Sequence, residues 1–327
     1  MKDFNLLTKR GKILRFRKAL LKALPRYSQR VDSLEFVAMK SKPVFRIRTK
    51  SGSFAAKFHD PSEHLLSQMF GELQFLDHIA RHSDLCVETP LANSQGELVT
   101  RVESDGLPEV AHVALCSWVL GRRLKDEMSA RSYRCLGESS AKLHKLSATF
   151  KPGKTFEILK NDRVFYWDKE TLLSRVDFKL LPKRRQELFK KGAHIAGKTI
   201  RDSWQSAAKP IVIHNDLHPC NIKVHGKRLS IFDFEDIVWG YAGQDIGTAV
   251  YHIRFRDDYS ELLGAFREGY ERVAEWPIES ERKLEGFIIA RLLMFANYVL
   301  NYNIRPHKYL PEYETKLEIL LNKNRSS

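Results

Sequence analysis

The sequence predicts an α+β protein, with a small antiparallel β-sheet near the N-terminus and a mainly helical region after it. Residues 44–49 alternate apolar and basic side chains. A Ser-Gly turn then leads into a second β-rich run at 54–58, so a β-hairpin is expected there. Beyond residue 130, apolar residues recur at helical spacing. Helices are therefore predicted at 132–147, 170–205, 258–275, 282–303 and 309–322.

The length of 327 residues allows two domains, and no low-complexity linker or internal repeat is visible. The apolar segment 115–121, which ends in glycine, is the best candidate for their junction. We therefore expect an N-terminal domain at 1–117 and a C-terminal domain at 118–327.

One polar loop in the helical region carries residues that indicate chemistry. The stretch His214-Asn215-Asp216-Leu217-His218-Pro219-Cys220-Asn221 follows a short apolar strand, and Asp233-Phe234-Glu235 comes twelve residues after it. Two short β-rich runs, joined by a turn that contains glycine, lie between the two motifs. Because both ends of a hairpin lie on the same side, Asn221 and Asp233 are expected to converge.

These residue types suit phosphoryl transfer from a nucleoside triphosphate. That reaction needs a carboxylate that faces the attacking hydroxyl and oxygen ligands that hold Mg²⁺ against the phosphates. Asp216 can supply the first, and Asn221 and Asp233 can supply the second. Each residue alone has an ordinary structural explanation: a buried histidine, a turn former or a loop cap. In this order and spacing, the set favours the enzymatic interpretation.

The two motifs resemble those of the aminoglycoside phosphotransferase and choline kinase-like superfamily, which shares the protein-kinase core. By this resemblance His214 and Asp216 are catalytic, with Asp216 as the base, and Asn221 and Asp233 bind the metal. Asp245, in the segment G-Q-D-I-G, matches the aspartate that braces the catalytic loop by hydrogen bonds. The resemblance implies a two-lobed protein-kinase-like fold, with ATP or GTP and Mg²⁺ as cofactors.

Departures from ordinary protein kinases point to a small acceptor. Glu235 stands where those enzymes have glycine, and His218 stands where they have lysine. Only twelve residues separate Asp233 from Asp245, which leaves no room for a long activation loop. Small-molecule kinases of the superfamily look like this.

The N-terminal half supplies an independent test, because a kinase needs a nucleotide-binding lobe. The predicted hairpin ends in A-A-K, which puts Lys57 where the resemblance expects the lysine that holds the phosphates. A helix is predicted from Asp60 to about Arg81, with Glu72 on its apolar stripe. A buried carboxylate is costly unless a cation meets it, so Lys57 is the expected partner of Glu72. Alternatively, Glu72 lies at the solvent-exposed edge of this apolar stripe, or Glu63 is the partner of Lys57.

Two other contacts with the nucleotide, from the segment 38–43 and from Trp118, are less clearly indicated by the sequence. The segment 38–43, between the first two strands, has no glycine, so Ser41 and the lysines near it would have to replace the backbone contacts of a glycine-rich loop. The stress response kinase A group looks similarly glycine-poor. Trp118, at the junction, is equally consistent with a contact to the adenine and with a place in the core.

The charge is concentrated at the N-terminus. Residues 1–57 contain 16 Lys and Arg against three acids, which gives +13 of the total +15. Residues 12–24 can form a basic amphipathic helix. We favour a helix that docks on the nucleotide-binding lobe with a solvated basic rim. Contact with an anionic membrane surface or with nucleic acid is the less favoured alternative.

Other features indicate a cytoplasmic protein. The four cysteines lack spacings typical of zinc sites or disulfides, and no signal peptide is visible. The apolar run 287–300 is short and interrupted by Arg291 and Asn297, which is typical of a buried core helix rather than a membrane span.

We therefore expect an ATP- and Mg²⁺-dependent phosphotransferase that acts on a hydroxyl of a small molecule, such as a sugar, an amino alcohol or an antibiotic-like compound. The absence of dense acidic clusters disfavours a polycationic aminoglycoside. A Ser/Thr protein kinase resembling stress response kinase A is the alternative, and a non-catalytic nucleic-acid or membrane-binding module is a third. The sequence indicates neither the acceptor nor the oligomeric state.

Overall fold

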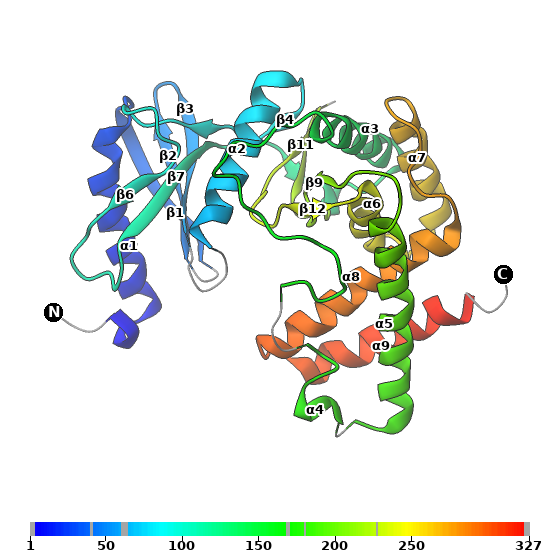
Figure 1. Ribbon diagram of the computed structural model, residues 1–327. Coiled ribbons are helices and arrows are strands. Elements are labelled where there is room, and N and C mark those ends of the chain that lie inside the picture. The colour runs from blue at the N-terminus through cyan, green and yellow to red at the C-terminus, as the bar shows by residue number, and fades with distance from the viewer. Residues whose placement is uncertain are drawn as a thin grey trace. The chain divides into compact units, whose positions relative to one another are not determined.

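The computed structural model describes residues 4–39, 42–59, 65–167, 171–179, 181–226 and 228–323. The chain divides into two compact units. The first comprises Met1–Gly121, Phe150–Glu157 and Ser230–Glu235, and the second comprises Arg122–Thr149, Ile158–Leu229 and Asp236–Ser327. The predicted α+β class is confirmed, with the larger sheet in the first unit and most of the helices in the second (Figure 1).

The first unit is built on an antiparallel sheet in the order β1-β2-β3-β7-β5, with β6 paired to β7. The predicted hairpin is β2 and β3, with Phe45 opposite Ala56. The strands are β1 (Val31–Met39), β2 (Pro43–Thr49), β3 (Gly52–Phe58), β5 (Pro90–Leu91), β6 (Thr100–Val102) and β7 (Ala111–Ser117). A separate short strand, β4 (Cys86–Val87), pairs in parallel with Ser230 and Ile231 of β11 (Arg228–Ile231).

Strand β7 shows how the sheet separates two apolar layers. Val113 and Leu115 belong to the core cluster under helix α1 (Lys9–Ala23), whereas Ala114 and Cys116 belong to the cluster under α2 (Leu66–His82). Successive side chains of a strand point to opposite faces, so alternating apolar residues bury both helices. The two helices accordingly lie on either side of the sheet (Figure 1).

Helix α1 docks on the sheet, as the favoured interpretation of the sequence expects. The Thr8 side chain caps its start by accepting from the Gly11 N–H at 3.2 Å. The buried face of the helix carries Phe16, Ala19, Leu20 and Ala23. Short 3₁₀ turns flank it at Phe4–Leu6 (η1) and Leu24–Arg26 (η2).

The second unit is mainly helical. Its helices are α3 (Ala130–Ser147), α4 (Val176–Lys179), α5 (Lys183–Trp204), α6 (Ala242–Tyr251), α7 (Tyr259–Glu271), α8 (Glu281–Asn301) and α9 (Pro306–Lys323). Its short strands are β8 (Arg122–Arg123), β9 (Ile211–Ile213), β10 (Ile222–His225) and β12 (Val238–Gly240), and η3 (Leu124–Asp126) follows β8. Antiparallel pairs form between β9 and β12 and between β8 and β10.

The single helix predicted at 170–205 is wrong over its first third. A four-residue turn, α4, precedes Pro182, and the long helix starts only at Lys183 with Pro182 as its N-cap residue. Proline disfavours helical geometry in the residue before it, so a helix that starts after proline is the expected outcome. The other predicted helices of this unit are confirmed to within a few residues.

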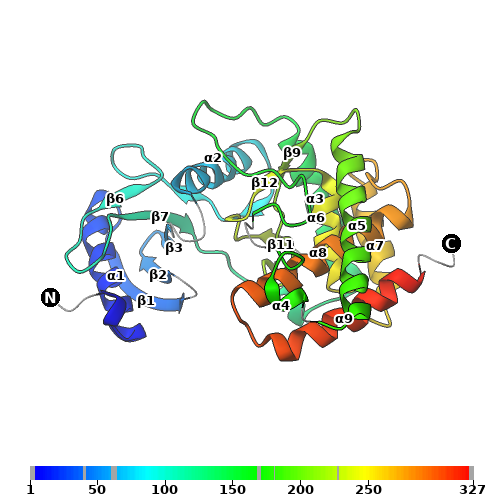
Figure 2. The ribbon, with the colours of Figure 1, turned by 60° about the horizontal axis from the view of Figure 1, so that its bottom comes forward.

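Two packing contacts hold the helices of the second unit together. Gly137 of α3 and Gly269 of α7 let the two helices touch, because a Cβ at either position would lie 1.9 Å from a backbone oxygen of the other helix. Helix α8 lies against α5, α6 and α9 (Figure 2). By length and composition α8 could cross a membrane, but most of its apolar stretch is buried in this unit, as expected for a core helix.

The two faces of α1 give a matched test of the packing. Leu20→Ala should lower the free energy of unfolding by about 2–5 kcal/mol, because it opens a cavity in the core under the helix. Leu21→Ala, next in sequence but on the exposed face, should change it by less than about 0.5 kcal/mol. Denaturant unfolding measures both values, and equal effects would contradict the docked position of the helix.

Candidate active site

Lys57, on β3, lies at the centre of an ion-pair cluster in the first unit. Its Nζ atom is 2.7 Å from Oε1 of Glu88, 3.3 Å from Oε1 of Glu72 and 3.8 Å from Oδ1 of Asp233. Glu72 comes from the buried face of α2, and Glu88 from the turn between β4 and β5. Three carboxylates therefore surround one ammonium group.

The cluster has more carboxylates than cations, and the side chains of Glu72 and Glu88 in it are buried. Burial raises the pKa of Glu72 to about 7, although the charge of Lys57 opposes the shift. Burial also disfavours the charged form of Lys57, but Glu88 and then Glu72 raise the Lys57 pKa well above its usual value. Lys57 therefore keeps its charge, and the surplus of carboxylates favours the approach of a further cation.

Asp233 is held beside Lys57 by its backbone and by its neighbour in sequence. Its N–H donates to Oε1 of Glu88 at 2.8 Å. Its φ of 69° lies in the left-handed region, which aspartate tolerates better than most residues. The next residue, Phe234, is fully buried, and its ring centroid lies 6.3 Å from that of Phe75 on α2. This anchor fixes the turn from which the Asp233 carboxylate projects.

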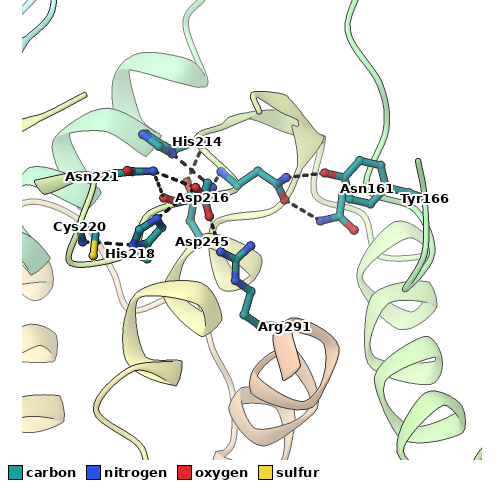
Figure 3. Close-up of polar contacts among 10 residues, drawn as sticks. Asn161, Tyr166, His214, Asp216, His218, Cys220, Asn221, Asp245 and Arg291 are labelled. Atoms are coloured by element: carbon teal, nitrogen blue, oxygen red, sulfur yellow. Dashed lines mark hydrogen bonds and ion pairs between the residues drawn. The ribbon is translucent and has the colours of Figure 1, made fainter. Parts of the chain in front are cut away.

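The loop expected to be catalytic lies in the second unit, between β9 and β10, around the carboxylate of Asp216 (Figure 3). The Asn221 side chain donates to Oδ2 of Asp216 at 2.8 Å and to its backbone carbonyl at 3.1 Å. Nη2 of Arg291, from α8, donates to Oδ1. Because Asn221 uses its amide nitrogen on Asp216, its amide oxygen is the atom that would bind a metal.

His218 supplies a third contact to Asp216, in a fixed tautomer. The Cys220 N–H donates to Nδ1 of His218 at 3.1 Å, so the proton of the neutral ring is on Nε2. Nε2 lies 3.3 Å from Oδ2 of Asp216 and can donate to it. Both oxygens of the carboxylate therefore have donors before any acceptor binds.

Arg291 is a site residue that the sequence analysis did not identify. It is buried in the middle of α8, and its guanidinium carbon lies 4.4 Å from the centroid of the Phe295 ring. Burial alone would raise the pKa of Asp216, but Arg291 and then the hydrogen bond from His218 lower that pKa below its usual value. Asp216 is therefore ionised at neutral pH. The sequence signal was an arginine inside an apolar run, which needs a buried carboxylate as its partner.

Asp245, on α6, braces the start of the loop. Its fully buried carboxylate accepts from the N–H groups of His214 at 2.9 Å and Asn215 at 2.5 Å. It also lies 3.1 Å from Nε2 of His144, whose Nδ1 is 2.9 Å from the hydroxyl of Tyr270. One carboxylate thus satisfies two buried backbone donors that would otherwise be costly.

Asn215 ties the other side of the loop to the rest of the unit. Its Oδ1 accepts from Asn161 at 2.9 Å, and its Nδ2 donates to the Tyr166 hydroxyl at 2.5 Å (Figure 3). Asn161 is itself held by Trp204, whose indole N–H donates to the Asn161 carbonyl at 2.8 Å. With Asp245 on one side and this network on the other, the residue before Asp216 has little freedom.

The other predicted site residues have different surroundings. His214, expected to be catalytic by resemblance, is 0 % exposed, and its Nδ1 accepts from the Asp216 N–H at 3.2 Å. We propose that its role is to position Asp216. Trp118 is half-buried, with the Arg46 guanidinium 4.6 Å from its ring centroid, and its contact with adenine stays a prediction. Ser41 and Glu63 lie outside the described residues.

The metal ligands expected from the sequence are Asn221 and Asp233. They belong to different units, so their convergence stays a prediction. Over the described part of the chain, no group of three or more His, Cys, Asp or Glu side chains is arranged to hold a metal ion. An amide and a carboxylate oxygen fit Mg²⁺, which in nucleotide sites is held by one or two carboxylates together with phosphates and water.

The charge of Asp216 should depend on Arg291. In Arg291→Met, the pKa of Asp216 should rise above its value in the unfolded chain, because burial then acts on the carboxylate without the largest opposing charge. In the unaltered protein, the Arg291–Asp216 ion pair contributes fully to the free energy of unfolding at any pH above the unfolded pKa of Asp216. This contribution is lost only as the pH falls below that value. The variant should instead lose stability as the pH rises from about 4 to 7.

Denaturant unfolding of the two proteins at several pH values measures this. Arg291→Lys keeps a cation and should show a much smaller effect. A loss of stability in Arg291→Met that is the same at pH 5 and pH 7 would show that the arginine acts through packing instead of charge.

Comparison with known proteins agrees with the fold. Residues 34–282 match the family model described as the phosphotransferase enzyme family. The amicoumacin kinase of Bacillus subtilis (strain 168) is 22% identical over 269 residues, which cover 79% of this chain and 77% of that protein.

Solved structures show the same fold at low sequence identity. An amicoumacin kinase in complex with AMP-PNP, Ca²⁺ and Ami has a TM-score of 0.74 at 15% identity, covering 94% of this chain and 96% of the other. A microcompartment-associated aminopropanol kinase has a TM-score of 0.68 at 20% identity, with 92% and 93% covered. A spectinomycin phosphotransferase in complex with ADP and spectinomycin has a TM-score of 0.63 at 12% identity, with 93% and 97% covered. The family model spans well over half of the chain, and the protein therefore belongs to the phosphotransferase enzyme family.

Proposed function

We propose that this protein is an ATP- and Mg²⁺-dependent phosphotransferase that moves the γ-phosphoryl group to a hydroxyl of a small molecule. The observation that carries the proposal is the ionised Asp216, whose two oxygens are held by Asn221, His218 and Arg291 on a loop braced by Asp245. A carboxylate fixed in this way can orient an acceptor hydroxyl and receive its proton as transfer proceeds.

The first unit would hold the nucleotide. Lys57 keeps its charge between Glu72 and Glu88 and would contact the phosphates. Asp233 and the amide oxygen of Asn221 would bind Mg²⁺, which neutralises charge on the transferring phosphoryl group. The surplus of carboxylates around Lys57 supports the binding of a divalent ion bound to a nucleotide.

Lys57 has Glu88 as a second carboxylate partner, in addition to Glu72 on helix α2. Oε1 of Glu88 is the nearest carboxylate oxygen to Lys57, and the same atom accepts the Asp233 N–H. We propose that Glu88 couples the position of the phosphate-binding lysine to that of the metal-binding aspartate. Glu72 would then tune the charge of the cluster.

A small alcohol is the proposed acceptor, and a protein acceptor is the alternative. The short connection from Asp233 to Asp245 supports the small acceptor. The relatives named above act, by their names, on amicoumacin, aminopropanol and spectinomycin, which supports an acceptor of that size. These three compounds are the first probes to assay, followed by a metabolite extract, with ATP and GTP compared as donors.

Removing the proposed base tests the mechanism. Asp216→Ala should lower kcat by about 10²–10⁴-fold, because the acceptor hydroxyl loses its proton acceptor. Binding of ATP, measured by calorimetry, should survive because Asp216 does not contact the nucleotide in this proposal. Phosphorylated product from the variant at the rate of the unaltered protein would exclude Asp216 as the base.

Because burial raises the pKa of Glu72 to about 7, binding of a divalent ion with the nucleotide should release protons from this carboxyl. A bound divalent ion favours the charged carboxylate, so at pH 7 binding of Mg²⁺–AMP-PNP should release about half a proton from Glu72. Calorimetry in buffers of different ionisation enthalpy measures this number. Glu72→Gln should remove the release, and Glu138→Gln, at a half-buried position on α3 in the other unit, should leave it intact. Equal release from all three proteins would contradict the assignment.

A further inference from the structure

The N-terminal segment is strongly basic for a part of the chain with no role in the proposed catalysis. Residues 4–31 contain nine Lys and Arg and no Asp or Glu. Lys18 lies 3.9 Å from Asp105, and both side chains are more than half exposed. Exposed pairs of this kind contribute little. Most of this positive charge therefore faces solvent.

Helix α1 has two different apolar faces. One is the docked face already described, around Phe16 and Leu20. The opposite face carries Leu14, which is 55% exposed, and Leu21, which is 47% exposed. The two leucines are seven residues apart, so they lie in line about two turns from each other. Leu6, in η1 just before the helix, is 72% exposed.

The cations of α1 flank this line of leucines. At about 100° per residue, Arg10 and Arg17 lie to one side of it and Lys18 and Lys22 to the other, and all four are exposed. A merely solvated rim would put charged groups, not leucines, at the centre of the outward face. Leucines in the centre with Lys and Arg at the edges are the pattern of a helix that lies in a lipid–water interface.

From this geometry we infer that the outward face of α1 binds an anionic lipid bilayer, with the helix parallel to its surface. Leu14 and Leu21 enter between the lipid headgroups, and the cations meet the phosphate and carboxylate groups of the lipids. The docked face stays on the sheet, so the whole first unit is held at the surface. Nucleic acid would satisfy the cations but would give the leucines no apolar partner.

The contributions of the cations and leucines of α1 to the affinity for an anionic bilayer can be estimated from typical values. Each Lys or Arg near an anionic surface strengthens binding by about fivefold, so replacing two should weaken it by about thirtyfold. Partial burial of two leucine side chains should contribute about tenfold or more. Added salt should weaken binding, because the cationic part is screened.

The test is sedimentation of the full-length protein with vesicles. Vesicles of phosphatidylcholine are compared with vesicles that also contain phosphatidylserine, and a mixed-sequence duplex oligonucleotide serves as the nucleic-acid probe. The variants are Leu14→Gln/Leu21→Gln, which keeps good helix formers, and Arg17→Gln/Lys22→Gln. Matched controls on the second unit are Lys190→Gln/Lys191→Gln on α5 and Ile319→Ser on α9, all at exposed positions.

We expect the protein to sediment with the phosphatidylserine vesicles and not with phosphatidylcholine alone. Both α1 variants should weaken this binding while the controls retain it, with helix content unchanged by circular dichroism. Failure to bind the anionic vesicles, or binding that the leucine variant leaves intact, would overturn the inference. Retention of the oligonucleotide alone, insensitive to the leucines, would reassign the surface to nucleic acid.

Discussion

The second unit depends on compensation of one partly buried charge, the carboxylate of Asp216. Both of its oxygens accept from donors, and these come from the catalytic loop and from Arg291 on α8. A buried carboxylate without such partners would take up a proton, and a protonated base cannot accept one from an alcohol. In the proposed mechanism, the apolar helix α8 therefore contributes by supplying Arg291, the cation that keeps Asp216 ionised.

The first unit shows the opposite balance. Around Lys57 the carboxylates outnumber the cation, so the cluster is left with negative charge that a divalent cation can compensate. The two clusters therefore differ in charge balance. The cluster around Asp216, the proposed base, is compensated by protein groups, and the cluster around Lys57 has an excess of carboxylates that a divalent ion would compensate. This division agrees with a reaction in which the protein supplies position and electrostatics rather than covalent chemistry.

Local pattern was enough to predict the β2–β3 hairpin and most helices, because each follows from spacing within a short segment. The contact between Lys57 and Glu72, now seen at 3.3 Å, was expected from the family resemblance together with the apolar stripe of the predicted helix. The roles of Glu88 and Arg291 could not be predicted in this way. Each meets its partner across a long separation in sequence, and neither lies in a recognisable motif. The break before α5 was missed because helical spacing continued across Pro182, although proline was the available signal.

The central claim is that Asn221 and Asp233 hold one divalent ion on a nucleotide, with Asp216 facing the acceptor. A crystal structure with AMP-PNP and Mn²⁺, located by its anomalous signal, tests this most directly. The account predicts one ion bound by the Asn221 amide oxygen, the Asp233 carboxylate and phosphate oxygens. A nucleotide bound with its metal away from both side chains would contradict it.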